Sequence, residues 1–305
     1  MKIATFNVEF LFDEGEHKHS GKTWKYSKEY VESRIEHLAK VISEIDADVL
    51  FLQEVASESA IKRIIEKTGK DYSYFLAEPD KRDVGNAVIY RLKDCTVQSI
   101  PAVTDFPVIV EGDTDVLGSK LFSRRAFVSL TTTYKDKPLH LFGLHLNSRF
   151  FVHLQSKTGA PLPTETQIQA ADGLIRSEIF RSIQAKKMRQ VIDELFTKDK
   201  SAQIAVMGDF NSLKRETPFR IILGEFATHD DALVSADEIQ PPEKPYSFIG
   251  EHGAKIIDYI LISKPLKASV KSFRILNDSL SHHINKPPAP TFIESDHAAM
   301  VVELD

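Results

Sequence analysis

The chain has 305 residues, of which 42% are hydrophobic and 27% are charged, and its formal net charge is −5. This composition is typical of a globular protein with a large core, and the acidic balance excludes a strongly basic field that would hold nucleic acid by charge alone. The single cysteine, Cys95, excludes an internal disulfide framework and a cysteine-rich zinc site.

Short apolar runs alternate with amphipathic stretches along the chain, which is typical of an α/β protein. We expect strands at residues 2–7, 49–52, 86–90, 126–132, 139–145, 203–207, 256–262, 269–275 and 298–304. A helix is expected over about 29–44, where apolar residues at offsets of three or four form one stripe. A second helix is expected over about 170–196. We interpret its basic residues as a solvated face: Arg176, Arg181, Lys186, Lys187 and Arg189.

Two segments, 13–25 and 149–166, are interpreted as loops or insertions, and 236–245 as irregular. We find no internal repeat and no long linker, so we expect a single domain spanning residues 1–305. The N-terminus shows no signal peptide, and no apolar run approaches the roughly 18 residues that a membrane span needs. A cytoplasmic monomer without stable membrane insertion is therefore expected, and a secreted protein with its signal removed stays open.

Polar residues follow or interrupt five of the expected strands. Asn7, Glu54 and His145 each lie at a strand end, and the string Gly208-Asp209-Phe210-Asn211 follows an apolar strand. In extended geometry Asp209 and Asn211 would point the same way. A rigidly held carboxylate such as that of Glu54 suits a hard cation.

An acidic residue lies inside the apolar strand 256–262, and an acid–histidine pair lies near the C-terminus. Burying a lone carboxylate is costly, so Asp258 should have a partner, and His297 is the candidate. His297, in Ser295-Asp296-His297, can take a proton from water near neutral pH, and Asp296 can hold a divalent cation.

In this order the motifs resemble those of the endonuclease/exonuclease/phosphatase superfamily of metal-dependent phosphodiesterases, which includes pancreatic-type deoxyribonucleases and AP endonucleases. The resemblance is carried by Thr5-Phe6-Asn7-Val8-Glu9, Leu52-Gln53-Glu54-Val55, His145-Leu146-Asn147-Ser148, Gly208-Asp209-Phe210-Asn211, Ile257-Asp258-Tyr259 and Ser295-Asp296-His297. It implies a four-layer α/β/β/α sandwich with two packed mixed sheets. The chain departs from the family at Phe10, where bacterial members have Asn, and at Ile256, where an Arg is frequent.

The resemblance also implies the roles of the site residues. The implied ligands of Mg²⁺ or Mn²⁺ are Glu54, with Asn7 and Asp296 directly or through water. His297 is the implied general base, oriented by Asp258. His145 is implied to stabilise developing charge or to protonate the leaving oxygen, and Asp209 to position the nucleophile or the metal. Asn211 is implied to donate a hydrogen bond to a phosphoryl oxygen. Asn147 and Arg124 are implied to bind substrate, and Arg125 could take the place of Arg124.

The expected activity is divalent-metal-dependent hydrolysis of phosphodiesters, with DNA or RNA as the first substrate. Hydrolysis of phospholipid, inositol phosphate or other small phosphate esters is the alternative, because the same chemistry serves them. A catalytically inactive scaffold on this fold is a remote alternative. The choice between endo- and exo-action, the number of metals and the division of work between the two histidines stay open.

Overall fold

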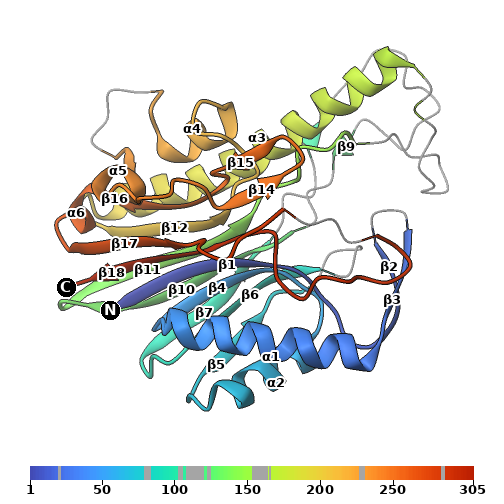
Figure 1. The fold of residues 1–305 in the computed structure, drawn as a ribbon. Coiled ribbons are helices and arrows are strands. Elements are labelled where there is room, and N and C mark those ends of the chain that lie inside the picture. The colour runs from blue at the N-terminus through green and yellow to red at the C-terminus, as the bar shows by residue number, and fades with distance from the viewer. Residues whose placement is uncertain are drawn as a thin grey trace.

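Two six-stranded mixed β-sheets packed face to face form the centre of the computed structural model (Figure 1). The structure describes residues 1–19, 22–78, 84–101, 106–107, 120–121, 125–152, 164, 166–226, 231–282 and 286–305. The first sheet has the order β17 (Val270–Leu276), β18 (Ala299–Leu304), β1 (Lys2–Leu11), β4 (Val49–Val55), β6 (Gly85–Tyr90) and β5 (Ser73–Leu76). The second has the order β13 (Leu233–Ser235), β16 (Asp258–Ser263), β12 (Gln203–Asp209), β11 (Lys137–His145), β10 (Phe127–Tyr134) and β7 (Cys95–Ile100).

Helices cover the outer face of each sheet, which completes four layers (Figure 1). Helices α1 (Lys28–Ile45) and α2 (Glu58–Thr68) cover the first sheet, and α3 (Gln167–Lys198) and α4 (Thr217–Leu223) cover the second. Two short helices, α5 (Ala236–Ile239) and α6 (Lys264–Lys267), lie next to β16. The α/β/β/α sandwich implied by the resemblance is confirmed.

The core between the sheets comes from the alternation of side chains along their strands. Ile3, Val49 and Phe51 of the first sheet belong to one buried cluster with Leu141 and Met207 of the second. Each fully buried side chain of this size contributes roughly 1.5–3 kcal/mol of transfer free energy. This packing fixes the distance between the sheets, and with it the distance between polar side chains at their shared edge.

All nine expected strands are present, and several continue further than predicted. Strand β1 extends to Leu11 and β4 extends to Val55, so Asn7 and Glu54 lie within strands and not after them. Helix α1 also agrees with its prediction: Ser27 caps it by accepting a hydrogen bond from the backbone N–H of Tyr30 at 3.1 Å, and Asp46 ends it in the left-handed conformation.

The segment 13–25, predicted to be a loop, instead contains the hairpin of β2 (Gly15–His19) and β3 (Lys22–Tyr26). Its polar composition obscured the alternation in β3, where Trp24 and Tyr26 are buried and Lys25 is exposed. The irregular segment 236–245 begins with α5, and most of 149–166 lies outside the described residues. Two further antiparallel strand pairs are β14 (Phe248–Gly250) with β15 (Gly253–Lys255), and β8 (Phe106–Pro107) with β9 (Lys120–Leu121).

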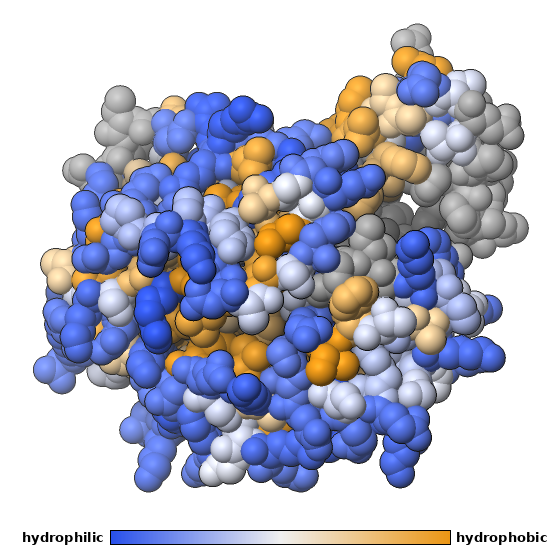
Figure 2. Space-filling view, in the orientation of Figure 1, coloured by the Kyte–Doolittle hydropathy of each residue, from blue (hydrophilic) through white to orange (hydrophobic). Residues whose placement is uncertain are grey.

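We predicted that the basic residues of helix α3 form a solvated face, but two of them do not. Arg176 and Arg181 are buried, and they donate to the carbonyls of Val152 at 3.0 Å and Ser148 at 2.9 Å. They therefore anchor the chain that follows β11 and do not face solvent. The first turns of α3 extend beyond the sheets, and hydrophobic side chains gather there (Figure 2), among them Ile168 and Ile175. In the part of the chain that the structure describes, no helix is long and apolar enough to cross a bilayer.

Candidate active site

Polar side chains from six strands or their ends meet at one edge of the sandwich. Parallel strands β11 and β12 end there with His145 beside Asp209, and antiparallel β16 begins there with Asp258 beside Asp209. From the other sheet, β1 and β4 bring Asn7 and Glu54, and His297 lies two residues before β18. The topology alone therefore gathers residues that are up to 290 positions apart in the sequence.

Bulges in β1 and β4 turn their side chains at this edge. The register between the two strands shifts after Asn7, and that between β4 and β6 shifts after Leu52. Glu9, Phe10 and Glu54 have φ values of +49°, +52° and +63°, which are uncommon for residues other than glycine. Bulges of this kind re-aim a side chain at the end of a sheet, and such backbone strain is concentrated at functional sites.

Asn7 links the carboxylates of the two sheets. Its Nδ2 atom donates to Asp209 Oδ2 at 3.1 Å and lies 3.4 Å from Glu54 Oε1, and its Oδ1 atom accepts from the backbone N–H of Glu9 at 3.0 Å. Glu54 also accepts a hydrogen bond from the backbone N–H of Phe10 at 3.2 Å. Burial raises the pKa of Glu54, against the lowering effect of Arg125. A cation near Glu54 would therefore be favoured.

His297 and Asp258 form a buried pair. The Nδ1 atom of His297 lies 2.8 Å from Asp258 Oδ2, which also accepts a hydrogen bond from the Ser247 hydroxyl at 2.7 Å. The Nε2 atom of His297 lies 3.8 Å from both Asp209 Oδ2 and Asp296 Oδ1. Burial alone would lower the pKa of His297, but the charge and hydrogen bond of Asp258, with Asp296 and Asp209, raise it well above its ordinary value. Asp258 therefore fixes the ring and makes it more basic.

Asp209 lies at the centre of the group. His145 Nε2 is 3.4 Å from Asp209 Oδ2 and 3.8 Å from Glu54 Oε1. Burial and the charge of Asp258 raise the pKa of Asp209 to about 7, although His297 and the Asn211 N–H oppose this. Asp209 can thus hold or release a proton near neutral pH.

Asn211 approaches Asp209 through a turn, and not through the extended geometry that we expected. Strand β12 ends at Asp209, and Asn211 has a φ of +46°. Its backbone N–H donates to Asp209 Oδ1 at 2.7 Å and its Nδ2 donates to Oδ2 at 3.2 Å. Gly208 is required before this turn: its φ is +140°, and a Cβ atom there would lie 1.9 Å from the Leu144 carbonyl oxygen.

Two residues hold the end of β1 against the segment that carries His297. The Ser295 hydroxyl donates to the Asn7 carbonyl at 2.7 Å and accepts from the His297 N–H at 3.1 Å. Arg34 of α1 is buried, and its guanidinium donates to the carbonyls of Val8, Glu9 (2.6 Å), Ile293 (2.9 Å) and Glu294 (3.2 Å). Arg34 thus connects the end of β1 to the segment that carries His297.

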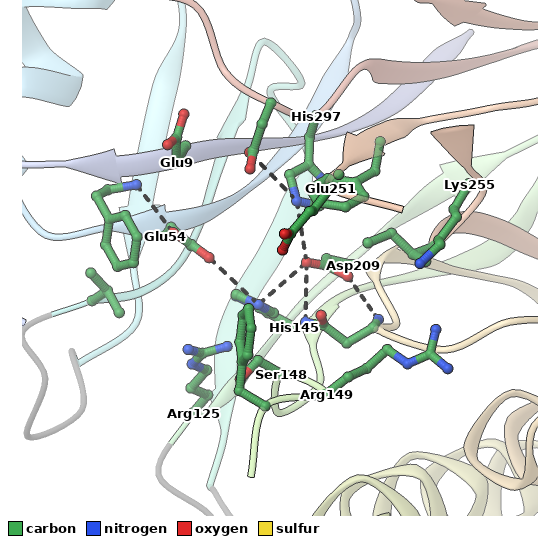
Figure 3. Close-up of a pocket in the computed structure, with 18 of the residues that line it drawn as sticks. Glu9, Glu54, Arg125, His145, Ser148, Arg149, Asp209, Glu251, Lys255 and His297 are labelled. Carbon is green, nitrogen blue, oxygen red and sulfur yellow. Dashed lines mark hydrogen bonds and ion pairs between the residues drawn. The ribbon is translucent and has the colours of Figure 1, made fainter. Parts of the chain in front are cut away.

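These side chains surround a pocket of about 650 Å³ (Figure 3). Its described lining residues include five carboxylates, three lysine or arginine side chains and three histidines: Glu9, Glu54, Asp209, Glu251 and Asp296; Arg125, Arg149 and Lys255; and His145, His252 and His297. Arg149 is further neutralised by an ion pair with Glu216. In Figure 3 His145, Asp209 and His297 converge on one space, with Arg125 and Arg149 at its side. The pocket therefore carries both carboxylates and basic side chains around a centre that contains His145 and His297.

The structure does not place all the predicted substrate residues at the pocket. Arg124 lies outside the described residues, whereas its neighbour Arg125 lines the pocket and lies 3.5 Å from the Leu146 carbonyl through Nη1. The Asn147 side chain donates to the Ser148 carbonyl at 3.2 Å, and Asn147 is not among the lining residues.

Sequence reasoning missed several residues at the pocket and one behind it. Glu251 and Lys255 come from the short β14–β15 hairpin, whose strands were not among those predicted. Arg34 carried a signal that could have been used, because a charged residue interrupts an apolar stripe between Val31 and Ile35.

The residues present fit a divalent cation. Glu54 and Asp296 offer carboxylate oxygens in the pocket, which are the ligands that Mg²⁺ and Mn²⁺ prefer. Asn7 turns its amide nitrogen toward Glu54 and Asp209, so in this structure it orients the carboxylates. A second possible cluster is formed by Asp209, Asp258 and His297, whose ligand atoms lie within 4.8 Å of one another. In that cluster Asp258 Oδ2 already accepts hydrogen bonds from Ser247 and His297, so the Glu54 side suits the ion better.

Comparisons with known proteins agree with this architecture. Residues 4–297 match the model of the Endonuclease/Exonuclease/phosphatase family, and no curated protein matches the chain. Among solved structures, truncated TDP2 from Caenorhabditis elegans is similar, with 16% identity, a TM-score of 0.59 and coverage of 99% of this chain and 96% of that one. A mannosyl-6-phosphatase from Bacteroides thetaiotaomicron has 16% identity, a TM-score of 0.57 and coverage of 100% and 99%. A family protein from Leptotrichia buccalis has 18% identity, a TM-score of 0.56 and coverage of 100% and 99%.

Proposed function

Because the chain belongs to the endonuclease/exonuclease/phosphatase family, we propose that it is a divalent-metal-dependent hydrolase of phosphate esters with His297 as the general base. The observation that carries the proposal is the buried pair of His297 and Asp258, with Nδ1 and Oδ2 separated by 2.8 Å while Nε2 is directed toward Asp209 and Asp296. A histidine held in this way can accept a proton from an attacking water through Nε2.

The other side chains divide the remaining work. Asn7 and Asn211 hold the Asp209 carboxyl from two sides, so Asp209 can position the attacking water or pass a proton. His145 lies on the opposite side of Asp209 from Asp258, where it can stabilise charge that develops on the phosphoryl group or protonate the leaving oxygen. Arg125 replaces Arg124 as the proposed phosphate-binding arginine, because it lines the pocket.

Glu54 and Asp296 are the proposed holders of the cation, with Asn7 orienting Glu54 or completing the site through water. When bound, Mg²⁺ or Mn²⁺ would withdraw negative charge from the phosphoryl oxygens and so ease attack by water. Arg34 and Ser295 keep this side of the site in register with His297.

We favour a small phosphate ester as the substrate over the nucleic acid that the sequence first suggested. The pocket has a volume of about 650 Å³, and five of its described lining residues are carboxylates. Two of these, Glu9 and Glu251, have no proposed role at the cation, and they would repel the further phosphates of a polymer. The Bacteroides protein of the same fold is named as a mannosyl-6-phosphatase, which agrees with a small ester.

Nucleic acid stays the second candidate because Arg125, Arg149 and Lys255 line the same pocket and can contact phosphates on either side of a scissile bond. The test incubates the protein with plasmid, single-stranded DNA, RNA and a panel of sugar, lipid-headgroup and inositol phosphates, with Mg²⁺ and with EDTA. We expect Mg²⁺-dependent release of phosphate or phosphomonoester from members of the small-ester panel. Cleavage of the polymers alone would establish the second candidate, and equal activity in EDTA would refute the proposed chemistry.

A further inference from the structure

A second cavity, of about 310 Å³, adjoins the pocket just described. The two cavities share Glu9, Phe10, Phe150, Phe248, Gly250, Glu251 and Asp296 as lining residues, so they lie side by side. The second cavity lies on the side of the β2–β3 hairpin, because Trp24 and Tyr26 of β3 and Tyr30 of α1 complete its wall. We refer to it as the aromatic cavity.

Aromatic rings form the wall of this cavity, and they are held by one another. The ring centroids of Tyr26 and Tyr30 are 5.8 Å apart, and those of Phe12 and Tyr26 are 5.3 Å apart. Trp24 and Tyr26 are 8% and 6% exposed, so the wall is part of the core of the first sheet. Such rings offer flat faces to an organic group and fix its orientation.

The aromatic cavity is also close to the reacting centre. The centroid of Phe248 lies 5.0 Å from that of His297, and Asp296 lines both cavities. A phosphoryl group placed between His145 and His297 would therefore leave its alcohol part free to enter the aromatic cavity.

The two cavities differ in the charged residues that line them. Glu9, Glu251 and Asp296 line the aromatic cavity, and the described residues around it include no lysine or arginine, whereas the first pocket has three such side chains. Carboxylates accept hydrogen bonds from hydroxyl or ammonium donors and repel a second phosphate. Aromatic faces attract cations and the apolar faces of rings.

We propose that the aromatic cavity binds the alcohol part of the phosphate ester and selects alcohols that carry no negative charge. A polyhydroxylated ring and a quaternary amino alcohol both have this chemistry. Their hydroxyl donors or positive charge would face Glu251 and Glu9. Their apolar surface would pack against Trp24, Tyr26 and Tyr30. A second phosphate on the alcohol weakens binding. This inference rests on the proposed function for the phosphoryl end of the ligand.

The binding test uses Trp24, which is the only tryptophan in the chain, as a fluorescent reporter inside the cavity. The protein carrying His297→Ala is titrated with Mg²⁺ present, using hexose 6-phosphate, choline phosphate, hexose 1,6-bisphosphate and inorganic phosphate. We expect saturable changes in Trp24 fluorescence with one or both of the first two ligands, at least about fivefold weaker binding of the bisphosphate, and little change with inorganic phosphate. Comparison of hexose 6-phosphate with choline phosphate shows whether the cavity binds a sugar or an amino alcohol.

Charge reversal at the rim provides the matched comparison. Glu251→Lys should weaken the preference for the monophosphate over the bisphosphate about fivefold. Glu14→Lys makes the same charge change at an exposed residue that lines neither cavity, and it should leave the preference unchanged. Equal responses of the two variants, or a fluorescence change with inorganic phosphate as large as with the esters, would overturn the inference. Failure of the wild-type protein to hydrolyse any ester would refute the proposed function. The fluorescence titration would still decide whether the aromatic cavity binds the alcohol part.

Discussion

The Nδ1 atom of His297 lies 2.8 Å from the Oδ2 atom of Asp258, and both side chains are buried. Asp258 is held by the Ser247 hydroxyl, so the carboxylate cannot rotate away from the ring without losing a second hydrogen bond. This leaves Nε2 as the atom that faces the pocket. The pair is the general base that we propose, and the proposed chemistry depends on it.

His297→Ala should reduce kcat about 10³-fold or more, because the proposed base is lost, and Asp258→Asn should reduce it about 10–100-fold by releasing the ring. The double variant should be no slower than His297→Ala alone, since Asp258 acts through His297. Steady-state rates on the best ester of the panel measure all three. Additive losses in the double variant would show that Asp258 has a separate role.

Glu54→Gln should weaken Mg²⁺ binding by about tenfold or more, because a ligand carboxylate is replaced by a neutral amide of the same shape. Asp258→Asn should leave Mg²⁺ binding within about twofold, since that carboxylate serves His297. Calorimetric titration of both variants with MgCl₂ compares the two candidate metal sites. The opposite ranking would place the ion among Asp209, Asp258 and His297. Absence of binding to the wild-type protein would favour the inactive scaffold.

Arg34→Met should lower kcat about tenfold or more with a smaller change in KM, because the end of β1 and the segment before Asp296 lose their common donor. It should also reduce the free energy of unfolding by about 1–3 kcal/mol, since buried carbonyls lose a partner. Arg34→Lys should recover part of the rate. Arg63→Met, on α2 away from the site, is the control for loss of an arginine and should keep the wild-type kcat. A loss of stability without loss of kcat would make Arg34 a purely structural residue.

Asp46 should make stability depend on acidic pH. Hydrogen bonds from Lys70 at 2.6 Å and Arg91 at 2.8 Å hold the pKa of Asp46 well below its usual range. A lowered folded-state pKa stabilises the protein above the unfolded-state pKa, and this contribution is lost as the pH falls below about 4. Because the side chain is 40% exposed, the contribution should be below about 1 kcal/mol.

Asp46→Asn is the matched variant, since asparagine also tolerates the left-handed conformation that ends α1. Urea unfolding should show the variant less stable at pH 7, with the difference shrinking toward pH 2.5. A difference that is constant over this range would mean that the ion pairs contribute nothing through ionisation.

Much of the fold could be predicted because the strands are short apolar runs and the two long helices are periodic. The bulges could not be predicted: nothing in Asn7-Val8-Glu9-Phe10 or in Gln53-Glu54-Val55 signals the positive φ values that turn Glu9 and Glu54. These conformations depend on pairing between strands that are about 40 residues apart, which local sequence does not contain.

The candidate site was predictable where burial of a charged residue required a partner. A carboxylate inside an apolar strand needed a partner, and His297 lies beside Asp258 as expected. The surroundings were not predictable, because Glu251 and Lys255 reach the pocket from a hairpin that only the tertiary fold brings near. The first choice of nucleic acid rested on family motifs, which do not report which residues line the pocket.

The most direct test of the central claim is the initial rate of hydrolysis of one small phosphate ester, chosen from the panel, by the wild-type protein and by His297→Ala. The rate is measured in Mg²⁺, after EDTA, and after Mg²⁺ is restored. We expect activity that EDTA abolishes and Mg²⁺ restores, and a loss of about 10³-fold or more in the variant. Activity that persists in EDTA, or a variant as fast as the wild type, would contradict the account.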